Sequence, residues 1–148
     1  MGDAEALAAE FERVHGGDAE GEAWHGPALR TVLAGLDAAA AAARPLPGGH
    51  SAAEVLAHVA AWRDYATAAL EGRREVPPED GWRRIDALAA GEWDALRARA
   101  EESLRRLAAA VRAADPARLE KCRDTLRFVL HHDLYHAGQI GLLRRASP

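Results

Sequence analysis

Alanine makes up roughly a quarter of this 148-residue chain, and alanine has the highest helix propensity of all residues. Aromatic and β-branched side chains, which favour strands, are sparse, and no stretch keeps up an alternation of apolar and polar residues. Several segments instead carry apolar residues at helical spacing, separated by glycine and proline. We therefore expect an all-α fold.

Two helices are predicted near the N-terminus. A short amphipathic helix runs from Asp3 to about Val14 and ends before a pair of glycines. The first helix of the main body begins at Pro27, because proline suits the first helical turn, and continues with apolar residues to Leu36. An alanine run then extends this helix or forms a separate turn, before prolines and glycines at 44–49 break the chain.

The second helix of the main body begins at a capping box. Ser51 and Glu54 have the spacing at which the serine side chain accepts from the N3 amide and the glutamate side chain accepts from the cap amide. The helix is expected to run to about Glu71, with a glycine suited to end it. A long surface connection over 73–85 follows.

Two longer helices complete the expected fold. The third covers roughly 86–114 and ends at Asp115-Pro116. The fourth begins near Asp124 or Thr125 and reaches about Arg145.

Charge and cysteine content narrow the class of protein. The formal net charge of -4 argues against a general nucleic-acid-binding protein. Cys122 is the single cysteine, which excludes an internal disulfide. The N-terminal segment lacks the apolar core of a signal peptide, and the longest apolar run, 38–43, is too short to span a bilayer. We expect one soluble cytoplasmic domain, residues 1–148, whose partners are neither nucleic acid nor membrane.

Three histidines are candidates for a shared site. His132 and His136 are separated by about 40° around the axis of the predicted last helix, so both imidazoles can face one point. His131 lies about 140° from His136 and cannot join them without distortion. His58 lies among apolar residues of the second main helix, which a bundle can bring to face the last one. Spacing alone also fits ordinary core or surface histidines.

The sequence around these histidines resembles the DinB/YfiT-like superfamily. The resemblance rests on HSAAEVLAHVAAWRD at 50–64, on HHDLYHAGQIGLLRR at 131–145 and on the segment WHGP that begins at Trp24. It extends over nearly the whole chain from Trp24 onward, and the combination HDxYHxGQI is quite specific. One histidine of the second helix and two of the last helix bind the metal in that family, and these positions correspond to His58, His132 and His136.

The resemblance also implies an architecture, a metal and a partner. It implies an up-down-down-up four-helix bundle, to which the helix at 3–14 is a short addition, and it implies a homodimer. Zinc, nickel or iron is the expected divalent metal. The small residues Ala137, Gly138 and Gly141 weakly favour the dimer, because they permit close helix approach.

The residue types of the candidate site indicate the class of reaction. Three neutral imidazoles leave a coordination position for water or substrate, which is typical of a catalytic metal. A metal activates a thiolate without a general base, whereas hydrolysis benefits from a carboxylate base that the histidine face does not supply. The resemblance implies either a thiol S-transferase, which joins a low-molecular-weight thiol to a small electrophile, or a hydrolase, and the missing base favours the transferase. A metal-dependent hydrolase and a non-enzymatic stress-response module with a structural metal remain alternatives.

Residues around the histidines have several possible roles. Gln139 lies on the same helical face and could orient a ligand or simply pack between helices. Trp62 and Tyr65 could form a wall of the site or belong to the core. Glu54 is occupied by the capping box, and Asp133 points away from the histidine face, towards the surface or another helix. No catalytic residue is assigned.

The remaining histidines are expected outside the site. His15 and His50 fall in predicted loop or cap positions, where solvent exposure accounts for them. His25 lies at the predicted start of the first main helix and could face the mouth of the site.

Overall fold

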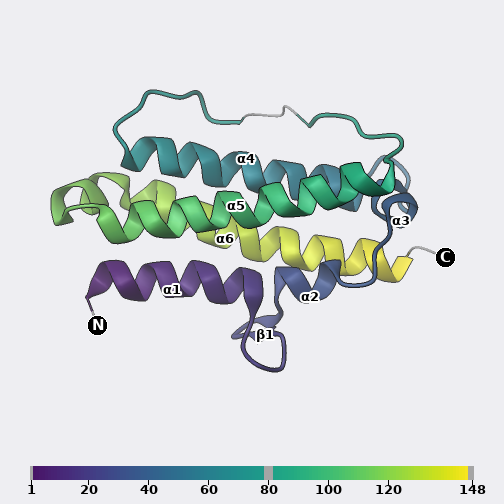
Figure 1. The fold of residues 1–148 in the computed structure, drawn as a ribbon, viewed down its shortest axis with the longest axis horizontal. Helices are drawn as coiled ribbons and strands as arrows, with labels where there is room; N and C mark the ends of the chain where they lie inside the picture. Colours follow the sequence, from purple (N-terminus) through teal and green to yellow (C-terminus); the bar gives the residue numbers. More distant parts are fainter. Residues whose placement is uncertain (1, 79–81, 147–148) are drawn as a thin grey trace.

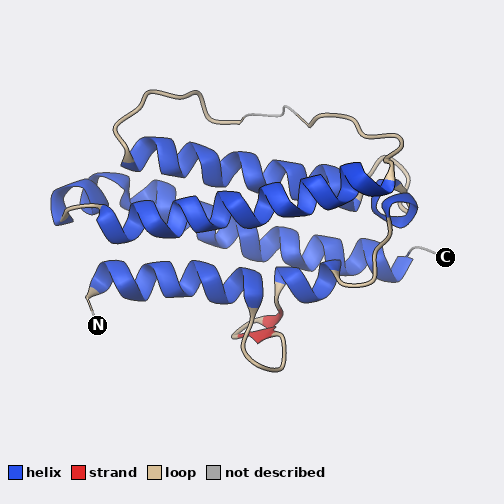
Figure 2. Cartoon of the chain, viewed as in Figure 1, coloured by secondary structure: helices blue, strands red, loops and turns tan. Residues whose placement is uncertain are grey.

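The structure, a computed structural model, describes residues 2–78 and 82–146 and is mainly helical, which confirms the expected fold class (Figure 2). A small antiparallel pair, β1 (Glu22–Ala23) and β2 (Gly26–Pro27), accompanies the helices. The helices are α1 (Asp3–Gly16), α2 (Leu29–Leu33), α3 (Ala38–Ala42), α4 (Ala52–Leu70), α5 (Ala90–Ala113) and α6 (Pro116–Ala146).

The long helices lie side by side (Figure 1). Helix α4 packs against both α5 and α6, while α1 packs mainly against α5 and α2 against α6. Helices α1 and α2 follow one another in a single row, so together they form one side of the molecule. Helices α4 and α5 run in the same direction, opposite to α1 and α6. The centre of the candidate site is the contact between α4 and α6.

The N-terminal part differs from its prediction. The helix expected from Pro27 covers only α2, because Pro27 lies in β2 and the chain turns at Gly35 with a φ of 80°. Helix α1 is not a peripheral addition, since its Phe11 is fully buried in the core. Between α1 and α2 the chain makes a tight excursion at Gly17, where a Cβ atom would lie 2.6 Å from the Gly21 carbonyl carbon. This excursion lets α2 continue the row that α1 begins (Figure 1).

The starts of the later helices follow their caps. The predicted capping box at Ser51 and Glu54 is present, with both reciprocal hydrogen bonds made. Helix α5 begins four residues later than expected, where the Glu92 carboxylate accepts from the Ala89 amide. The alanine run forms the separate helix α3, capped by Asp37, whose side chain accepts from the Ala40 amide at 2.8 Å.

The start of the last helix was predicted wrongly. Helix α6 begins at Pro116 rather than near Asp124, because proline lacks only an amide that the first helical turn leaves unpaired anyway. The Asp115 side chain accepts from the Arg118 amide at 2.8 Å and so caps this start. The Asp-Pro pair therefore ends one helix and begins the next. Cys122 consequently lies inside α6, where it is buried.

The apolar core has two parts along the length of the helices. One part contains the first half of α4, up to Ala60, and the last part of α6, from Ala137. The other contains the second half of α4, from Ala66, and the earlier part of α6, up to Leu130. Between these two apolar parts lie Arg63 of α4 and, on α6, His132, Asp133 and His136.

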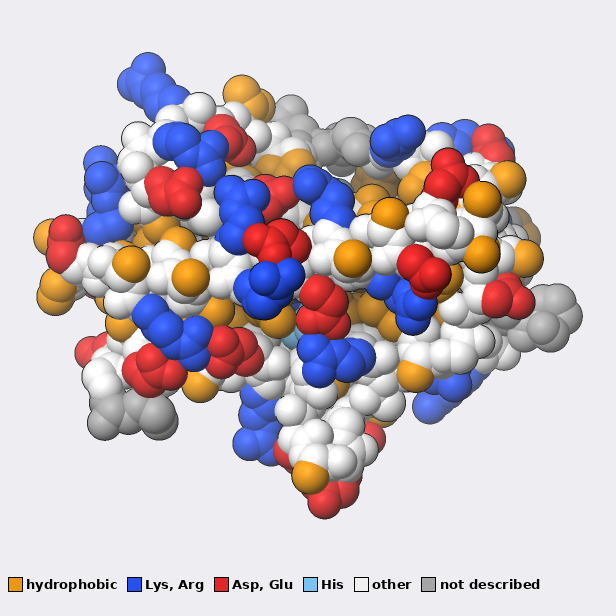
Figure 3. Space-filling model, viewed as in Figure 1, with side chains coloured by type: hydrophobic (Ala, Val, Ile, Leu, Met, Phe, Trp, Pro, Cys, Tyr) orange, Lys and Arg blue, Asp and Glu red, His pale blue; other side chains and the backbone are white. Residues whose placement is uncertain are grey.

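The surface over α5 and α1 mixes charges of both signs (Figure 3). Its ion pairs include Arg30 with Glu101, Arg99 with Asp64, and Arg112 with Glu5 and Glu12. In the part of the chain that the structure describes, no helix has both the length and the apolar character needed to cross a membrane.

Candidate metal centre

The three predicted histidines converge where α4 meets α6. His58 comes from α4, and His132 and His136 come from α6. Each offers one ring nitrogen, and these three nitrogens lie within 4.8 Å of one another. The ring centroids are 4.9 Å apart for His58 and His132, 5.2 Å for His58 and His136, and 4.2 Å for His132 and His136. We call these three residues the histidine cluster.

Helical periodicity explains the two contributions from α6. His132 and His136 are four residues apart and share the face that meets α4. His131 is exposed and takes no part in the cluster, as its angle around the helix predicts. His25 is exposed beside Trp24 and also lies outside the cluster.

Burial keeps the cluster uncharged at neutral pH. It lowers the pKa of His58 to about 4, with smaller contributions from His136 and His50. It lowers the pKa of His132 to about 3, again with help from the neighbouring imidazoles. The pKa of His136 is also lowered by burial, although the hydrogen bond with Gln139 opposes this. Neutral imidazoles have the free lone pair that a metal ion requires.

The hydrogen bonds of the cluster direct its nitrogens. Gln139 Oε1 lies 2.8 Å from His136 Nδ1, and an amide oxygen only accepts, so Nδ1 carries the proton. His136 Nε2 is then an unprotonated nitrogen, 2.9 Å from His132 Nε2. The other nitrogen of His132, Nδ1, is buried and has no hydrogen-bond partner among the residues that the structure describes. The protein atoms alone therefore leave the polar groups of this cluster incompletely satisfied.

The cluster fits a small divalent cation. Two nitrogens bound to one tetrahedral zinc at the usual bond length are about 3.4 Å apart. The Nε2 atoms of His132 and His136 are 2.9 Å apart, and all three ligand nitrogens lie within 4.8 Å of one another. Small side-chain rotations bring these distances to the value for a bound zinc ion. His58 Nε2 accepts from the Trp62 indole N–H at 3.1 Å, so a metal there takes Nδ1 or replaces this hydrogen bond.

Aromatic rings enclose the cluster. Trp82 stacks on His58 with centroids 4.1 Å apart, and it also stacks on His50 at 3.7 Å. On another side, the ring centroids of Trp62 and Phe128 each lie 5.5 Å from that of His132. Trp62 is thus a wall residue, one of the two roles that the sequence left open. The sequence did not indicate Trp82, which lies on the connection between α4 and α5.

His50 does not have the simple exposed role expected for it. Its ring is partly covered by Trp82, and its Nδ1 lies 3.4 Å from Glu54 Oε2. Glu54 is almost fully buried and also accepts from the Ser51 and Ile85 amides and from Arg44. Burial alone would raise the pKa of Glu54, but these hydrogen bonds and the charge of Arg44 lower it overall. A carboxylate with so many donors is poorly suited to act as a general base.

Asp133 points away from the cluster, as expected, and its partner is an arginine of α4. Arg63 Nε donates to Asp133 Oδ2 at 2.7 Å, and both side chains are fully buried. Burial raises the pKa of Asp133, although the charge of Arg63 opposes this. Arg63 was not singled out from the sequence. The available signal was its position, since it occupies a buried place in the helical pattern of Leu56 and Ala60.

The buried ion pair continues into α1, where a second expectation fails. His15 was expected to be exposed but is 1% exposed, because it completes the hydrogen bonds of Arg63. Both terminal nitrogens of Arg63 lie 3.2 Å from His15 Nδ1. His15 Nε2 in turn lies 2.9 Å from Glu101 Oε1. Glu101 also forms an ion pair with Arg30 at the surface. We call Asp133, Arg63, His15 and Glu101 the polar network.

Comparison with known proteins identifies the family of the chain. The family model of the DinB superfamily matches residues 23–140, so the chain belongs to the DinB superfamily. The matched segment contains all of the histidine cluster. Searches of curated proteins and of solved structures found no significant match.

Proposed function

We propose that this protein is a metal-dependent thiol S-transferase in which His58, His132 and His136 hold a divalent metal. The observation that carries the proposal is the convergence of three neutral imidazoles without a carboxylate among them. Superfamily membership is consistent with it, because DinB-like proteins are typically metal-binding. A divalent metal there would act as a Lewis acid that favours the deprotonated form of a bound thiol.

The chain's own residues have defined parts in this proposal. Gln139 Oε1 accepts a hydrogen bond from His136 Nδ1. This hydrogen bond orients the ring so that its Nε2 faces the cluster. Trp82, Trp62 and Phe128 exclude water from the sides of the cluster. With no protein carboxylate ligand, the metal would keep its full positive charge and favour an anionic sulfur. The small electrophile would approach from solvent, to which His58 and His132 are partly exposed.

The absence of a free base separates this proposal from hydrolysis. A hydrolase benefits from a carboxylate that removes a proton from water. Within the described residues, Glu54 is saturated with donors and Asp133 faces Arg63 instead of the cluster. Metal-dependent turnover of esters or amides, with no response to thiols, would favour the hydrolase instead.

The first experiment compares alanine variants of neighbouring histidines. Metal content is measured on untagged protein, because an affinity tag binds metal itself. His132→Ala and His136→Ala should reduce binding from about one divalent ion per chain to none. His131→Ala is the matched control, since His131 lies on the same helix but is exposed, and it should bind normally. Equal loss in all three variants would overturn the metal assignment.

The same samples test the reaction class. In cobalt-loaded protein, a low-molecular-weight thiol should produce a sulfur-to-metal charge-transfer band that His136→Ala lacks. A metal that is bound but responds to no thiol and supports no turnover would favour a structural role in a binding module.

We further propose the up-down-down-up bundle topology and a homodimer for this protein. The directions of α1, α4, α5 and α6 in Figure 1 support the topology. Of the small residues first considered for the dimer, Ala137 is buried and Gly141 packs beside Val32, so only Gly138 is exposed. A different feature supports pairing, namely an exposed apolar stripe of Phe128, Tyr135 and Leu142 on α6. Positions seven apart drift by only about 20° around a helix, so the stripe follows one face.

A further inference from the structure

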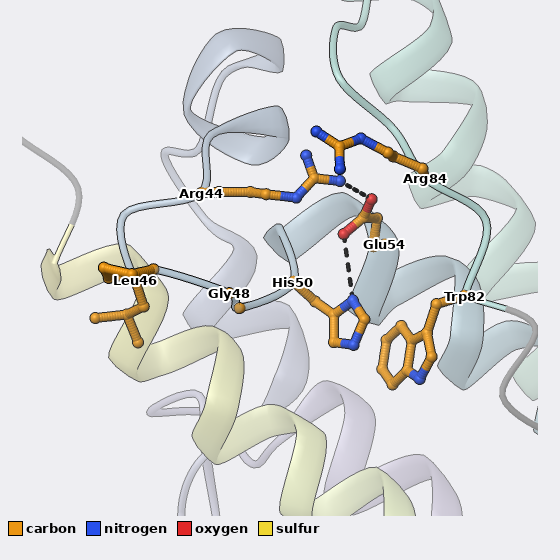
Figure 4. A pocket seen from close by; sticks show the side chains of 9 residues that line it. Arg44, Leu46, Gly48, His50, Glu54, Trp82 and Arg84 are labelled. Atoms are coloured by element: carbon orange, nitrogen blue, oxygen red, sulfur yellow. Dashed lines mark hydrogen bonds and ion pairs between the residues drawn. The ribbon is translucent and has the colours of Figure 1, made fainter.

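A recess of about 480 Å³ lies beside the histidine cluster and has no role in the proposal above. It is bounded by the loop before α4, the first turns of α4 and the segment that begins at Trp82 (Figure 4). Its lining includes Arg44, Gly48, His50, Glu54, Trp82 and Arg84.

Trp82 borders both the recess and the cluster. Trp82 lines the recess and stacks on His50, another lining residue, with ring planes 13° apart. The same indole stacks on His58, with ring planes 18° apart. A small molecule that occupied the recess would therefore lie next to the candidate metal ligands.

The polar edge of the recess carries two guanidinium groups. Figure 4 shows the guanidinium groups of Arg44 and Arg84 close together above Glu54. Glu54 is 2% exposed at its side chain and holds Arg44 in place, so the position of this guanidinium is set by a buried anchor. Asp86 contacts both arginines but does not line the recess.

Arg84 has donors to spare. Its Nε donates to Asp86, and no contact of its two terminal nitrogens is seen with the described residues. An arginine has five N–H donors in a planar fork that matches a carboxylate. Among the described lining residues there are thus two guanidinium groups and one carboxylate, Glu54, which already accepts from four groups.

We infer that this recess binds the carboxylate of a small organic acid, with Arg84 as its main ligand and Arg44 beside it. Paired charge-assisted hydrogen bonds from a guanidinium favour a carboxylate over a neutral group of the same size. The edge of the Trp82 indole and the apolar Leu46 accommodate the carbon chain of the ligand. Resting on the proposed function, the inference names the substrate class: the thiol carries a carboxylate, which the recess holds while the sulfur reaches the metal.

The first test compares two small thiols on cobalt-loaded full-length protein. The probes are 3-mercaptopropionate, which has a carboxylate, and 2-mercaptoethanol, which has none. The charge-transfer band should give a dissociation constant about tenfold lower for 3-mercaptopropionate, as one charge-assisted contact allows. Arg84→Gln should remove this preference, and its side chain is 73% exposed, so the fold should tolerate the change. Arg83→Gln is the matched control, because it removes the same charge from the adjacent exposed position.

The second test does not depend on a metal. In the His136→Ala variant, the indole N–H resonance of Trp82, assigned through Trp82→Phe, is followed by nuclear magnetic resonance. Adding 3-mercaptopropionate should shift this resonance, whereas 2-mercaptoethanol should not. Combining Arg84→Gln with His136→Ala should abolish the shift.

The outcomes separate the recess from the reaction. A Trp82 shift that needs Arg84, with no thiol band for either probe, would support the carboxylate site and overturn the transferase proposal. Equal affinity of wild-type protein for the two thiols would overturn the inference. A preference that persists in Arg84→Gln would also overturn it, because the carboxylate would then bind elsewhere, such as on the metal. If Arg83→Gln also removed the preference for 3-mercaptopropionate, the preference would depend on the general positive charge of this segment. That result would overturn the inference too.

Discussion

Gln139 is a residue whose role depends on one hydrogen bond. Its side-chain oxygen lies 2.8 Å from His136 Nδ1 and selects the tautomer whose unprotonated Nε2 faces the cluster. Partners of this kind orient metal-binding imidazoles and raise their basicity. Interhelical packing, the other role considered for Gln139, does not account for this contact.

Replacing Gln139 by leucine should weaken metal binding without removing it. Gln139→Leu keeps the size of the side chain but leaves His136 Nδ1 without its acceptor, so the metal dissociation constant should rise about 10- to 100-fold. Competition with a chelator of known affinity measures this change. Gln139→Glu is the control, because a carboxylate still accepts from Nδ1 and should preserve affinity. Unchanged affinity in Gln139→Leu would show that the tautomer of His136 does not depend on this residue.

At the scale of elements, the pair Arg63–Asp133 joins α4 to α6 next to the histidine cluster. Asp133 is adjacent to His132 in the chain but points about 100° away from it around the helix. The same Arg63 also donates to the Ala100 carbonyl of α5 at 3.2 Å and to His15 of α1. One guanidinium therefore contacts three other helices, so the rotation of each helix about its axis is restrained by a shared partner.

Breaking this pair from one side should be costly. Arg63→Met leaves the Asp133 carboxylate buried without its cation, and loss of one member of a buried pair typically costs about 3–5 kcal/mol of unfolding free energy. Urea denaturation of metal-free protein measures the loss. The double variant Arg63→Met with Asp133→Leu should recover part of it, because two apolar groups leave no uncompensated charge. If the double variant were as unstable as the single one, the lost unfolding free energy would come from the missing contacts of Arg63 with His15 and Ala100 instead.

At the scale of the whole molecule, the stripe of Phe128, Tyr135 and Leu142 predicts self-association. Light scattering at micromolar concentration should give twice the chain mass of 15.9 kDa. Leu142→Glu should give the monomer mass, because it places a charge on the face that contacts the second copy. Leu142 is 57% exposed in the single chain. Val76→Glu is the matched control, since Val76 is an exposed apolar residue of the connection after α4. A monomer in the wild type would contradict the homodimer.

Local features of the fold could be predicted from the sequence because their causes lie within a few residues. The capping box depends on Ser51 and Glu54, three positions apart, and the shared face of His132 and His136 depends on a spacing of four. The helical character of the chain follows from local propensity in the same way. The angle of His131 around the helix, which keeps it out of the histidine cluster, also depends only on short-range geometry. The start of α6 shows the limit, since Asp115-Pro116 both ends a helix and begins one.

The sequence by itself therefore determined the all-helical class, most helix ends and, through resemblance, the three histidines. Tertiary structure alone decided which faces meet. Arg63 and Asp133 are 70 residues apart, and Arg63 and His15 are 48 apart. Such pairs form because burial of apolar faces brings helices together and leaves polar groups that must find partners inside. Helix propensity does not encode that pairing, so the polar network and the recess beside Trp82 became visible only in the folded chain.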